Sequence, residues 1–146
     1  MFKDEVWQDI KGLSGVPIFV VVIIFSFLVG MQQLALQLLC GLILAYVVTV
    51  IIRFVYFKRR PDKQAYKNII EKIDASSFPS LHAMRAAVLA TILSLAFNNS
   101  LLTVLFALCA IGVAVSRVMT KRHYMSDVIV GLILGVIVGW LATFIS

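Results

Sequence analysis

Polar and ionisable side chains gather in three short clusters in a chain that is otherwise mostly apolar. The first holds two arginines, the second a histidine directly after a Pro-Ser-Leu run, and the third an arginine, a histidine and an aspartate. These clusters are Arg53-x6-Arg60-Pro61, Pro79-Ser80-Leu81-His82 and Ser116-Arg117-x5-His123-x3-Asp127. Ionisable groups beside apolar segments are costly and are by default candidates for a functional site.

The arginines indicate that this site binds an anion. A guanidinium keeps its charge and matches two phosphate oxygens at once. We predict that three of them together hold a tetrahedral oxyanion: Arg53, Arg60 and Arg117. A helix beginning near Leu81 would add backbone donors such as the Leu81 amide, since helix N-termini bind anions and Pro79 suits the first helical position. The hydroxyl of Ser80 would add a further contact.

The histidines and the aspartate indicate nucleophilic catalysis. His123 and Asp127 are four residues apart, so on one helix they would share a face. The carboxylate would then hold the imidazole in the tautomer that leaves its other nitrogen free to attack phosphorus. His82, with an ordinary pKa near ~6.5, would donate a proton to the departing alkoxide. The predicted covalent intermediate is phosphohistidine.

Other roles for these residues stay open at this point. His82, His123 and Asp127 also form a set that can bind a metal ion, although three nearby arginines would oppose a bound dication. We therefore expect neither a metal nor a cofactor. Arg85, one turn beyond His82, either contacts the substrate or extends toward lipid phosphates. Ser116 is a further candidate for the phosphate site.

The elements that carry these clusters are predicted from hydropathy. The chain has 146 residues, is 62% hydrophobic and has a mean hydropathy of +1.03. Five apolar stretches approach the ~20 residues that cross a bilayer. They are Val16–Gly30, Leu34–Phe57, Leu81–Phe97, Leu101–Met119 and Val128–Ile145. We predict an all-α integral membrane bundle of five transmembrane helices, forming one domain over residues 1–146.

Two further segments are expected to lie at the membrane surface. Residues 1–14 place apolar side chains at helical spacing among charges, which is typical of an interfacial helix. No signal-peptide cleavage site follows them, so we expect this segment to be retained. Residues 58–79 are expected to form a loop with a short helix, which either covers the site or is only a solvated connection.

The charges predict the orientation of the bundle. Following the five spans places all 13 Lys and Arg at one end, and ten remain there without the three site arginines. The positive-inside tendency then makes this face cytoplasmic, in a cell membrane. The net charge of +6 is explained by topology and lipid headgroups, and we expect no nucleic-acid partner. Four basic side chains are expected to extend to lipid phosphates: Lys58, Arg59, Lys121 and Arg122.

In order and internal spacing, the three clusters resemble the signature motifs of the type 2 phosphatidic acid phosphatase family, over roughly residues 53–127. The resemblance implies that His123 is the nucleophile, that His82 is the general acid and that no metal is required. Arg53 stands where the family usually has lysine, which should preserve phosphate binding. Leu81 replaces the usual glycine and is expected either to select the leaving group or to slow the reaction. The chain also resembles a shortened member that lacks one span near the N-terminus.

Together these observations predict a metal-independent membrane phosphatase that acts on a lipid or polyprenyl phosphate or diphosphate. Two alternatives stay open: a phosphotransferase with an acceptor other than water, and a catalytically silent protein that binds lipid phosphates. Glycines repeat every four residues in the last span and allow close helix packing, either within the bundle or in a homodimer. They are Gly131, Gly135 and Gly139.

Overall fold

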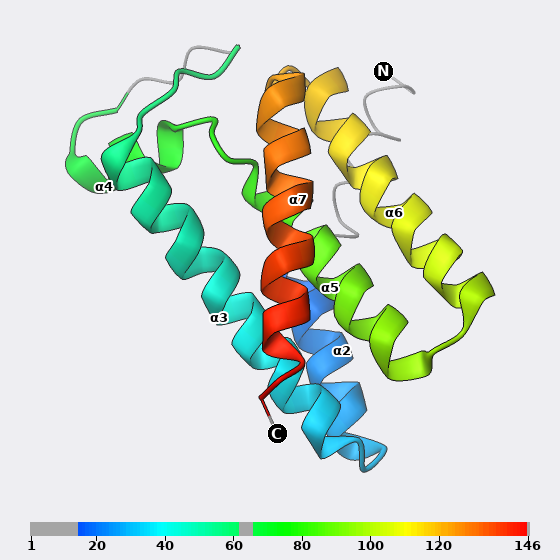
Figure 1. Ribbon diagram of the computed structural model, residues 1–146. Helices are drawn as coiled ribbons and strands as arrows, with labels where there is room; N and C mark the ends of the chain where they lie inside the picture. Colours follow the sequence, from blue (N-terminus) through cyan, green and yellow to red (C-terminus); the bar gives the residue numbers. More distant parts are fainter. Residues whose placement is uncertain (1–14, 62–65, 146) are drawn as a thin grey trace.

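The computed structural model describes residues 15–61 and 66–145, and six α-helices account for most of them (Figure 1). The helices are α2 (Val16–Leu28), α3 (Gln32–Val55), α4 (Ile69–Ala75), α5 (Leu81–Phe97), α6 (Ser100–Met119) and α7 (Met125–Ala142). No strand is named within these ranges, which agrees with the predicted all-α class. The expected interfacial helix over residues 1–14 lies outside the described residues.

Five of the helices are apolar, and their bounds lie within about three residues of the predicted spans. Three of them have the length and hydropathy to cross a membrane: α3 with 24 residues, α6 with 20 and α7 with 18. Helices α2 and α5 are shorter, with 13 and 17 residues. The chain is therefore a multi-pass membrane protein with at least three helices of spanning length.

Helix α5 lies at the centre of the bundle, between α7, α6 and α3 (Figure 1). Its side chains Met84, Val88 and Ile92 are fully buried, and they pack in one core cluster with Phe19 from α2 and Leu38 from α3. Side chains on the outer surface are apolar too, as in Phe54 and Leu101, which are 72% and 78% exposed. Apolar side chains on both faces are what a bundle surrounded by lipid requires.

The glycines of α7 let this helix pack closely against α5. A methyl group on Gly131 would lie 2.6 Å from the carbonyl oxygen of Ser80, and one on Gly139 would lie 3.1 Å from that of Val88. Gly135 faces the carbonyl oxygen of Met84 in the same way. Of the two uses that the sequence left open for these glycines, the structure therefore shows packing within the bundle, because α5 of the same chain lies against the stripe.

Candidate active site

The two arginines of the first cluster hold the C-terminal end of α4. Arg53, at the end of α3, is 7% exposed and donates to the carbonyl oxygens of Pro79 at 3.0 Å and Ile73 at 3.3 Å. Arg60 donates to the carbonyl oxygen of Asp74 at 2.5 Å. The last carbonyls of a helix have no partner within it, so cations bind there favourably. Both guanidinium groups are thus placed at one end of the bundle by α4.

A short antiparallel contact joins the first cluster to the second. Residues Arg59 and Ser76 form an isolated β-bridge. The backbone N–H of Ser77 donates to the carbonyl oxygen of Lys58 at 2.8 Å, and the Ser77 hydroxyl donates to that of Arg59 at 3.3 Å. The segment after α3 and the segment before α5 therefore lie side by side, although nothing in the hydropathy pattern indicates this pairing.

Helix α5 begins at Leu81, and Ser80 is its N-cap. The Ser80 hydroxyl accepts from the backbone N–H of Ala83 at 3.5 Å, and the Ser80 N–H donates to the carbonyl oxygen of Asp127 at 3.0 Å. Pro79 consequently precedes the cap and is not the first helical residue that the sequence suggested. Ser80 is fully buried, and it joins the start of α5 to the start of α7.

Arg117 and His123 are brought together by the way α6 ends. The backbone N–H groups of Arg122 and His123 both donate to the carbonyl oxygen of Arg117, each at 3.2 Å, and that of Lys121 donates to Val118 at 2.9 Å. Lys121 has a φ of +55°. This is the Schellman pattern of a helix C-terminus. The five residues between Arg117 and His123 therefore form a tight turn, which places the backbone of His123 beside the last turn of α6.

The His123 imidazole is 3% exposed and is oriented by a main-chain carbonyl. Its Nδ1 lies 2.7 Å from the carbonyl oxygen of Ser77. A carbonyl oxygen only accepts, so Nδ1 carries the hydrogen, and Nε2 of the neutral ring has the free lone pair that a nucleophile needs.

Burial and positive charge keep the His123 ring neutral. Desolvation by burial lowers the pKa of His123 to about 3, and the hydrogen bond to Ser77 opposes this effect. Three guanidinium charges also act to lower the pKa of His123: those of Arg117, Arg60 and Arg53. The three predicted arginines thus lie close enough to the predicted nucleophile to act on it electrostatically.

Asp127 does not take the role that its spacing from His123 suggested. His123 precedes α7, whose N-cap is Tyr124, so His123 and Asp127 do not share a helical face. The fully buried carboxylate accepts the Tyr124 backbone N–H at Oδ2, at 2.9 Å, and the Lys58 ammonium at Oδ1, at 2.6 Å. The expected Asp127–His123 pair is replaced by a helix cap and an ion pair.

Lys58 also lies in a different environment from the lipid-facing one that the sequence predicted. Its ammonium points into the protein instead of toward lipid phosphates, and it lies 2.6 Å from Asp127 Oδ1 and 3.0 Å from the Ser126 hydroxyl. The rings of Tyr124 and Phe78 flank it, with centroids at 4.8 and 5.8 Å.

Arg85 and Ser116 have contacts inside the bundle. Arg85 is 4% exposed and donates to the Tyr46 hydroxyl of α3 at 2.7 Å, so it does not extend to the membrane surface. The Ser116 hydroxyl donates to the carbonyl oxygen of Val113 in its own helix at 2.7 Å. His82 lies half-buried in the first turn of α5. Within residues 15–61 and 66–145 no group of three His, Cys, Asp or Glu side chains forms a metal-ligand arrangement.

Sequence reasoning missed two residues that hold this end of the bundle, Lys58 and Ser77. Lys58 has one detectable signal: it stands two residues before Arg60, and alternate residues of an extended segment share a side. Ser77 acts through its backbone carbonyl, which no side-chain pattern reveals.

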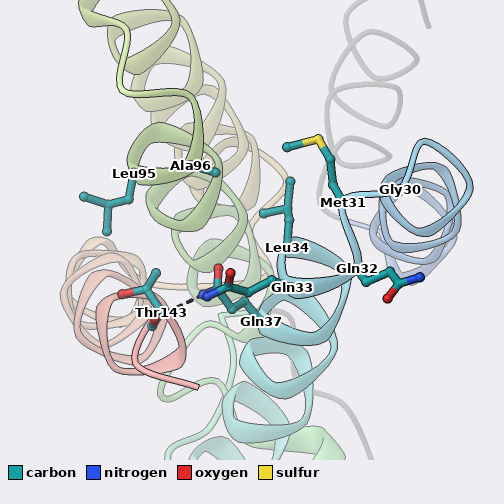
Figure 2. A pocket seen from close by; sticks show the side chains of 9 residues that line it. All are labelled: Gly30, Met31, Gln32, Gln33, Leu34, Gln37, Leu95, Ala96 and Thr143. Atoms are coloured by element: carbon teal, nitrogen blue, oxygen red, sulfur yellow. Dashed lines mark hydrogen bonds between the residues drawn. The ribbon is translucent and has the colours of Figure 1, made fainter. Parts of the chain in front are cut away.

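Two hollows lie beside the apolar helices in the part of the chain that the structure describes. An apolar one of about 170 Å³ lies where α2, α5 and α6 meet and includes Ala86 and Ala90 of α5 and Val113 of α6. Figure 2 shows the larger one, of about 540 Å³, at the end of the bundle opposite the charged one, beside the α2–α3 turn. There the Gln37 amide donates to the carbonyl oxygen of Thr143 at 3.0 Å and thereby holds the end of α7.

The sequence model of the PAP2 superfamily matches residues 34–146. Decaprenylphosphoryl-5-phosphoribose phosphatase from two strains of Mycobacterium tuberculosis is 33% identical over 99 residues, which are 68% of this chain and 54% of the relative. The chain thus spans about half the length of these curated relatives.

Two solved structures share the fold. The crystal structure of Aquifex aeolicus LpxE matches with a TM-score of 0.81 and 21% identity, covering 97% of this chain and 85% of that one. The crystal structure of a transmembrane PAP2 type phosphatidylglycerolphosphate phosphatase from Bacillus subtilis matches with a TM-score of 0.78 and 23% identity, covering 98% and 76%.

Proposed function

The chain belongs to the PAP2 superfamily, and from this membership and the geometry of its charged end we propose that it is a membrane lipid phosphatase. Its substrate is a lipid or polyprenyl phosphate or diphosphate, and its reaction proceeds through a phosphohistidine without a metal ion. One observation carries the proposal. The buried His123 ring has Nδ1 fixed by Ser77 and lies within the field of three arginines, so its Nε2 is a neutral nucleophile beside an anion site.

The reaction has two displacements at phosphorus. With a monophosphate, His123 Nε2 attacks phosphorus, the bond from phosphorus to the lipid oxygen breaks, and His82 donates its proton to the leaving alkoxide. With a diphosphate, the attack is at the terminal phosphorus, the bond to the bridging oxygen breaks, and the leaving group is the lipid monophosphate. Water then attacks the phosphohistidine, His82 takes a proton from that water, and the bond from phosphorus to Nε2 breaks to release inorganic phosphate. Arg53, Arg60 and Arg117 stabilise the charge on the phosphoryl oxygens in both steps. Backbone amides at the start of α5, including that of Leu81, add donors, while Ser80 caps this helix.

The apolar hollow between α5 and α6 supports a lipid substrate. Ala86 follows His82 by four residues, so the hollow begins on the helical face that carries His82. A headgroup at the arginines would leave its tail beside this hollow. We further propose that α2, α3, α5, α6 and α7 all cross the membrane, and that the charged end faces the cytoplasm of the cell.

Phosphate release from defined lipids tests the proposal. The purified chain is given phosphatidic acid, phosphatidylglycerol phosphate, and a polyprenyl phosphate and diphosphate in detergent with excess chelator, beside His123→Ala. We expect the wild type to release inorganic phosphate from at least one substrate and His123→Ala to be at least a thousandfold slower. Equal rates would remove His123 as nucleophile, and loss of turnover with chelator would show that a metal is required.

The same assay separates hydrolysis from phosphoryl transfer. A phosphatase releases one inorganic phosphate for each lipid alcohol formed from a monophosphate. Lipid alcohol without inorganic phosphate would indicate transfer to another acceptor, and binding without turnover would indicate a silent lipid-phosphate receptor.

A further inference from the structure

Lys58 lies where three segments of the charged end meet. Its backbone carbonyl accepts from Ser77 at 2.8 Å, its backbone N–H donates to the Ser76 hydroxyl at 3.3 Å, and its ammonium binds Asp127 at 2.6 Å. One residue therefore contacts both the segment that orients His123 and the first turn of α7. None of the three clusters recognised in the sequence assigns Lys58 a role.

These contacts close a ring of interactions around the nucleophile. From Lys58 the ring passes through the Ser77 backbone, whose carbonyl holds His123 Nδ1 at 2.7 Å. In the other direction it passes through Asp127, whose carbonyl oxygen accepts the N–H of Ser80 at the start of α5 at 3.0 Å. A displacement of Lys58 would therefore be transmitted to His123 and to the first turn of α5 together.

The ion pair has the geometry of a specific contact. Asp127 is fully buried and the Lys58 side chain is 28% exposed, so the carboxylate depends on this ammonium for compensation. Removing one partner of a buried pair leaves an uncompensated charge and is strongly destabilising. The aromatic rings of Tyr124 and Phe78 favour the cation at this position.

We propose that Lys58 is a positioning residue for the phosphatase reaction and that it acts through its ion pair with Asp127. Ser77 supplies the orienting acceptor for the imidazole. The Lys58–Asp127 pair keeps the segment after α3, which also carries Arg60 two residues later, against the start of α7. This inference rests on the proposed function.

The variants that test it are Lys58→Met, Lys58→Arg, Asp127→Asn and the double variant Lys58→Met/Asp127→Asn. The matched control is Arg59→Met, which removes an exposed positive charge one residue away. Phosphate release is measured with phosphatidic acid or with whichever lipid of the panel the wild type hydrolyses. Thermal unfolding in detergent is recorded for every variant.

A positioning role predicts a specific pattern of kinetic constants. We expect Lys58→Met to lower kcat at least tenfold with KM within threefold of wild type, and Lys58→Arg to recover kcat to within threefold. The double variant should be no slower than the slower single variant, because both substitutions break one contact. Arg59→Met should match the wild type.

Other patterns would overturn the proposal. A raised KM with unchanged kcat in Lys58→Met would make Lys58 a direct phosphate ligand, and effects that multiply in the double variant would make the two residues independent. Lys58→Arg as slow as Lys58→Met would also contradict it. If Lys58→Met does not fold, the double variant and Lys58→Arg still decide the question, since neither leaves a buried charge without a partner.

A measurement without substrate separates this inference from the proposed function. With ¹⁵N-labelled histidine in the ligand-free protein, Lys58→Met should shift the His123 ring resonances and Arg59→Met should not. Unchanged His123 resonances in Lys58→Met would refute the positioning role even if the lipid is hydrolysed. A wild type that hydrolyses no lipid phosphate would refute the proposed function, while the resonance shift still reports on Lys58.

Discussion

The His123 imidazole is held by a main-chain carbonyl and lies within the electrostatic influence of three guanidinium groups, and both features act on its protonation. The carbonyl of Ser77 fixes the hydrogen on Nδ1, while burial and the arginines disfavour a second proton. The result is a ring that is neutral at physiological pH without help from a carboxylate. Asp127 is thereby available for its contacts with Lys58 and with the N-terminus of α7.

This environment predicts how His123 titrates. In a His82→Asn variant with ¹⁵N-labelled histidine, we expect His123 to remain neutral from pH 7 down to about pH 4, because burial lowers its pKa to about 3. Inorganic phosphate should raise this pKa, since a bound anion neutralises the surrounding arginines. A ring that gains its proton near pH 6.5 without phosphate would contradict the structure.

The same shift sets the sign of a pH effect on stability. The pKa of His123 is lower in the folded state than the ordinary value near ~6.5, so the unfolded chain binds the proton more tightly. Stability should therefore fall as the pH falls from about 6.5 toward 3. Thermal unfolding should show a smaller decrease over this range in His123→Asn than in the wild type. Equal decreases would show that His123 makes no contribution.

Leu81 is the first residue of α5 and is half-buried where the sequence pattern usually has glycine. We expect its side chain to narrow the approach to the backbone donors of this turn. We expect Leu81→Gly to raise kcat/KM severalfold for the diphosphate relative to the monophosphate, at a cost of about 0.5–1 kcal/mol in stability. Leu81→Ala should lie between the two. An equal change for both substrates would show that Leu81 does not select among them.

Helices α5 and α7 approach each other so closely that three glycines of α7 lie directly against backbone carbonyls of α5. This pair carries His82 and Asp127 on adjacent first turns, so its spacing also sets the geometry of the charged end. The glycine spacing alone left open whether the partner helix belongs to the same chain. The structure decides in favour of α5.

A glycine replacement in each of two helices tests this packing. Gly135→Ala would place a methyl group against the Met84 carbonyl, and we expect it to destabilise the fold by about 1–3 kcal/mol and to lower activity. The control is Gly112→Ala in α6, where a methyl group meets no atom within 4 Å. That change should be neutral or stabilising by up to about 1 kcal/mol. Equal unfolding temperatures for both variants would contradict the packing.

The apolar hollow between α5 and α6 leads to a prediction about the lipid tail. Ala90→Leu would fill part of the 170 Å³ space, and we expect it to raise KM for long-chain substrates while leaving KM for a short-chain lipid phosphate unchanged. Ala107→Leu, on the exposed side of α6, serves as the control. Equal changes for both chain lengths would place the tail elsewhere.

The elements of this fold were predictable and the connections between them were not. The long apolar runs predict the bounds of the five apolar helices to within a few residues. A membrane-crossing helix is one of the few structures that can place so many consecutive apolar side chains in lipid or in a core. Lys121 in a left-handed conformation and the Arg59–Ser76 bridge have no such signature. For this reason the sequence indicated the candidate site residues but not their contacts. Only the structure shows that Asp127 pairs with Lys58 and that His123 pairs with Ser77.

Within the residues that the structure describes, the bundle has one charged end and one end without Lys, Arg, Asp or Glu. The described basic site residues lie where α3 and α6 end and where α5 and α7 begin, and the turns Gly30–Met31 and Asn98–Asn99 lie at the other (Figure 1). The hollow at the uncharged end is lined by glutamines and apolar side chains (Figure 2). The asymmetry of charge supports the proposed orientation.

Cysteine labelling tests that orientation. In a background with Cys40→Ala and Cys109→Ser, a cysteine at Ser100 should react with a membrane-impermeant reagent in intact cells. A cysteine at Lys121 should react only after permeabilisation. The reverse pattern would place the charged end outside the cell.

The contacts of Arg53 and Arg60 with the end of α4 have a consequence for turnover. Both guanidinium groups already donate to peptide carbonyls, at Ile73, Pro79 and Asp74, so an incoming headgroup competes with the protein's own backbone for these hydrogen bonds. In the proposed reaction, a lipid substrate would have its tail in the bilayer to offset that competition, whereas free inorganic phosphate would have none. We therefore expect the same carbonyls that keep the arginines in place to favour departure of the product, and accumulated phosphate to inhibit the proposed reaction only weakly.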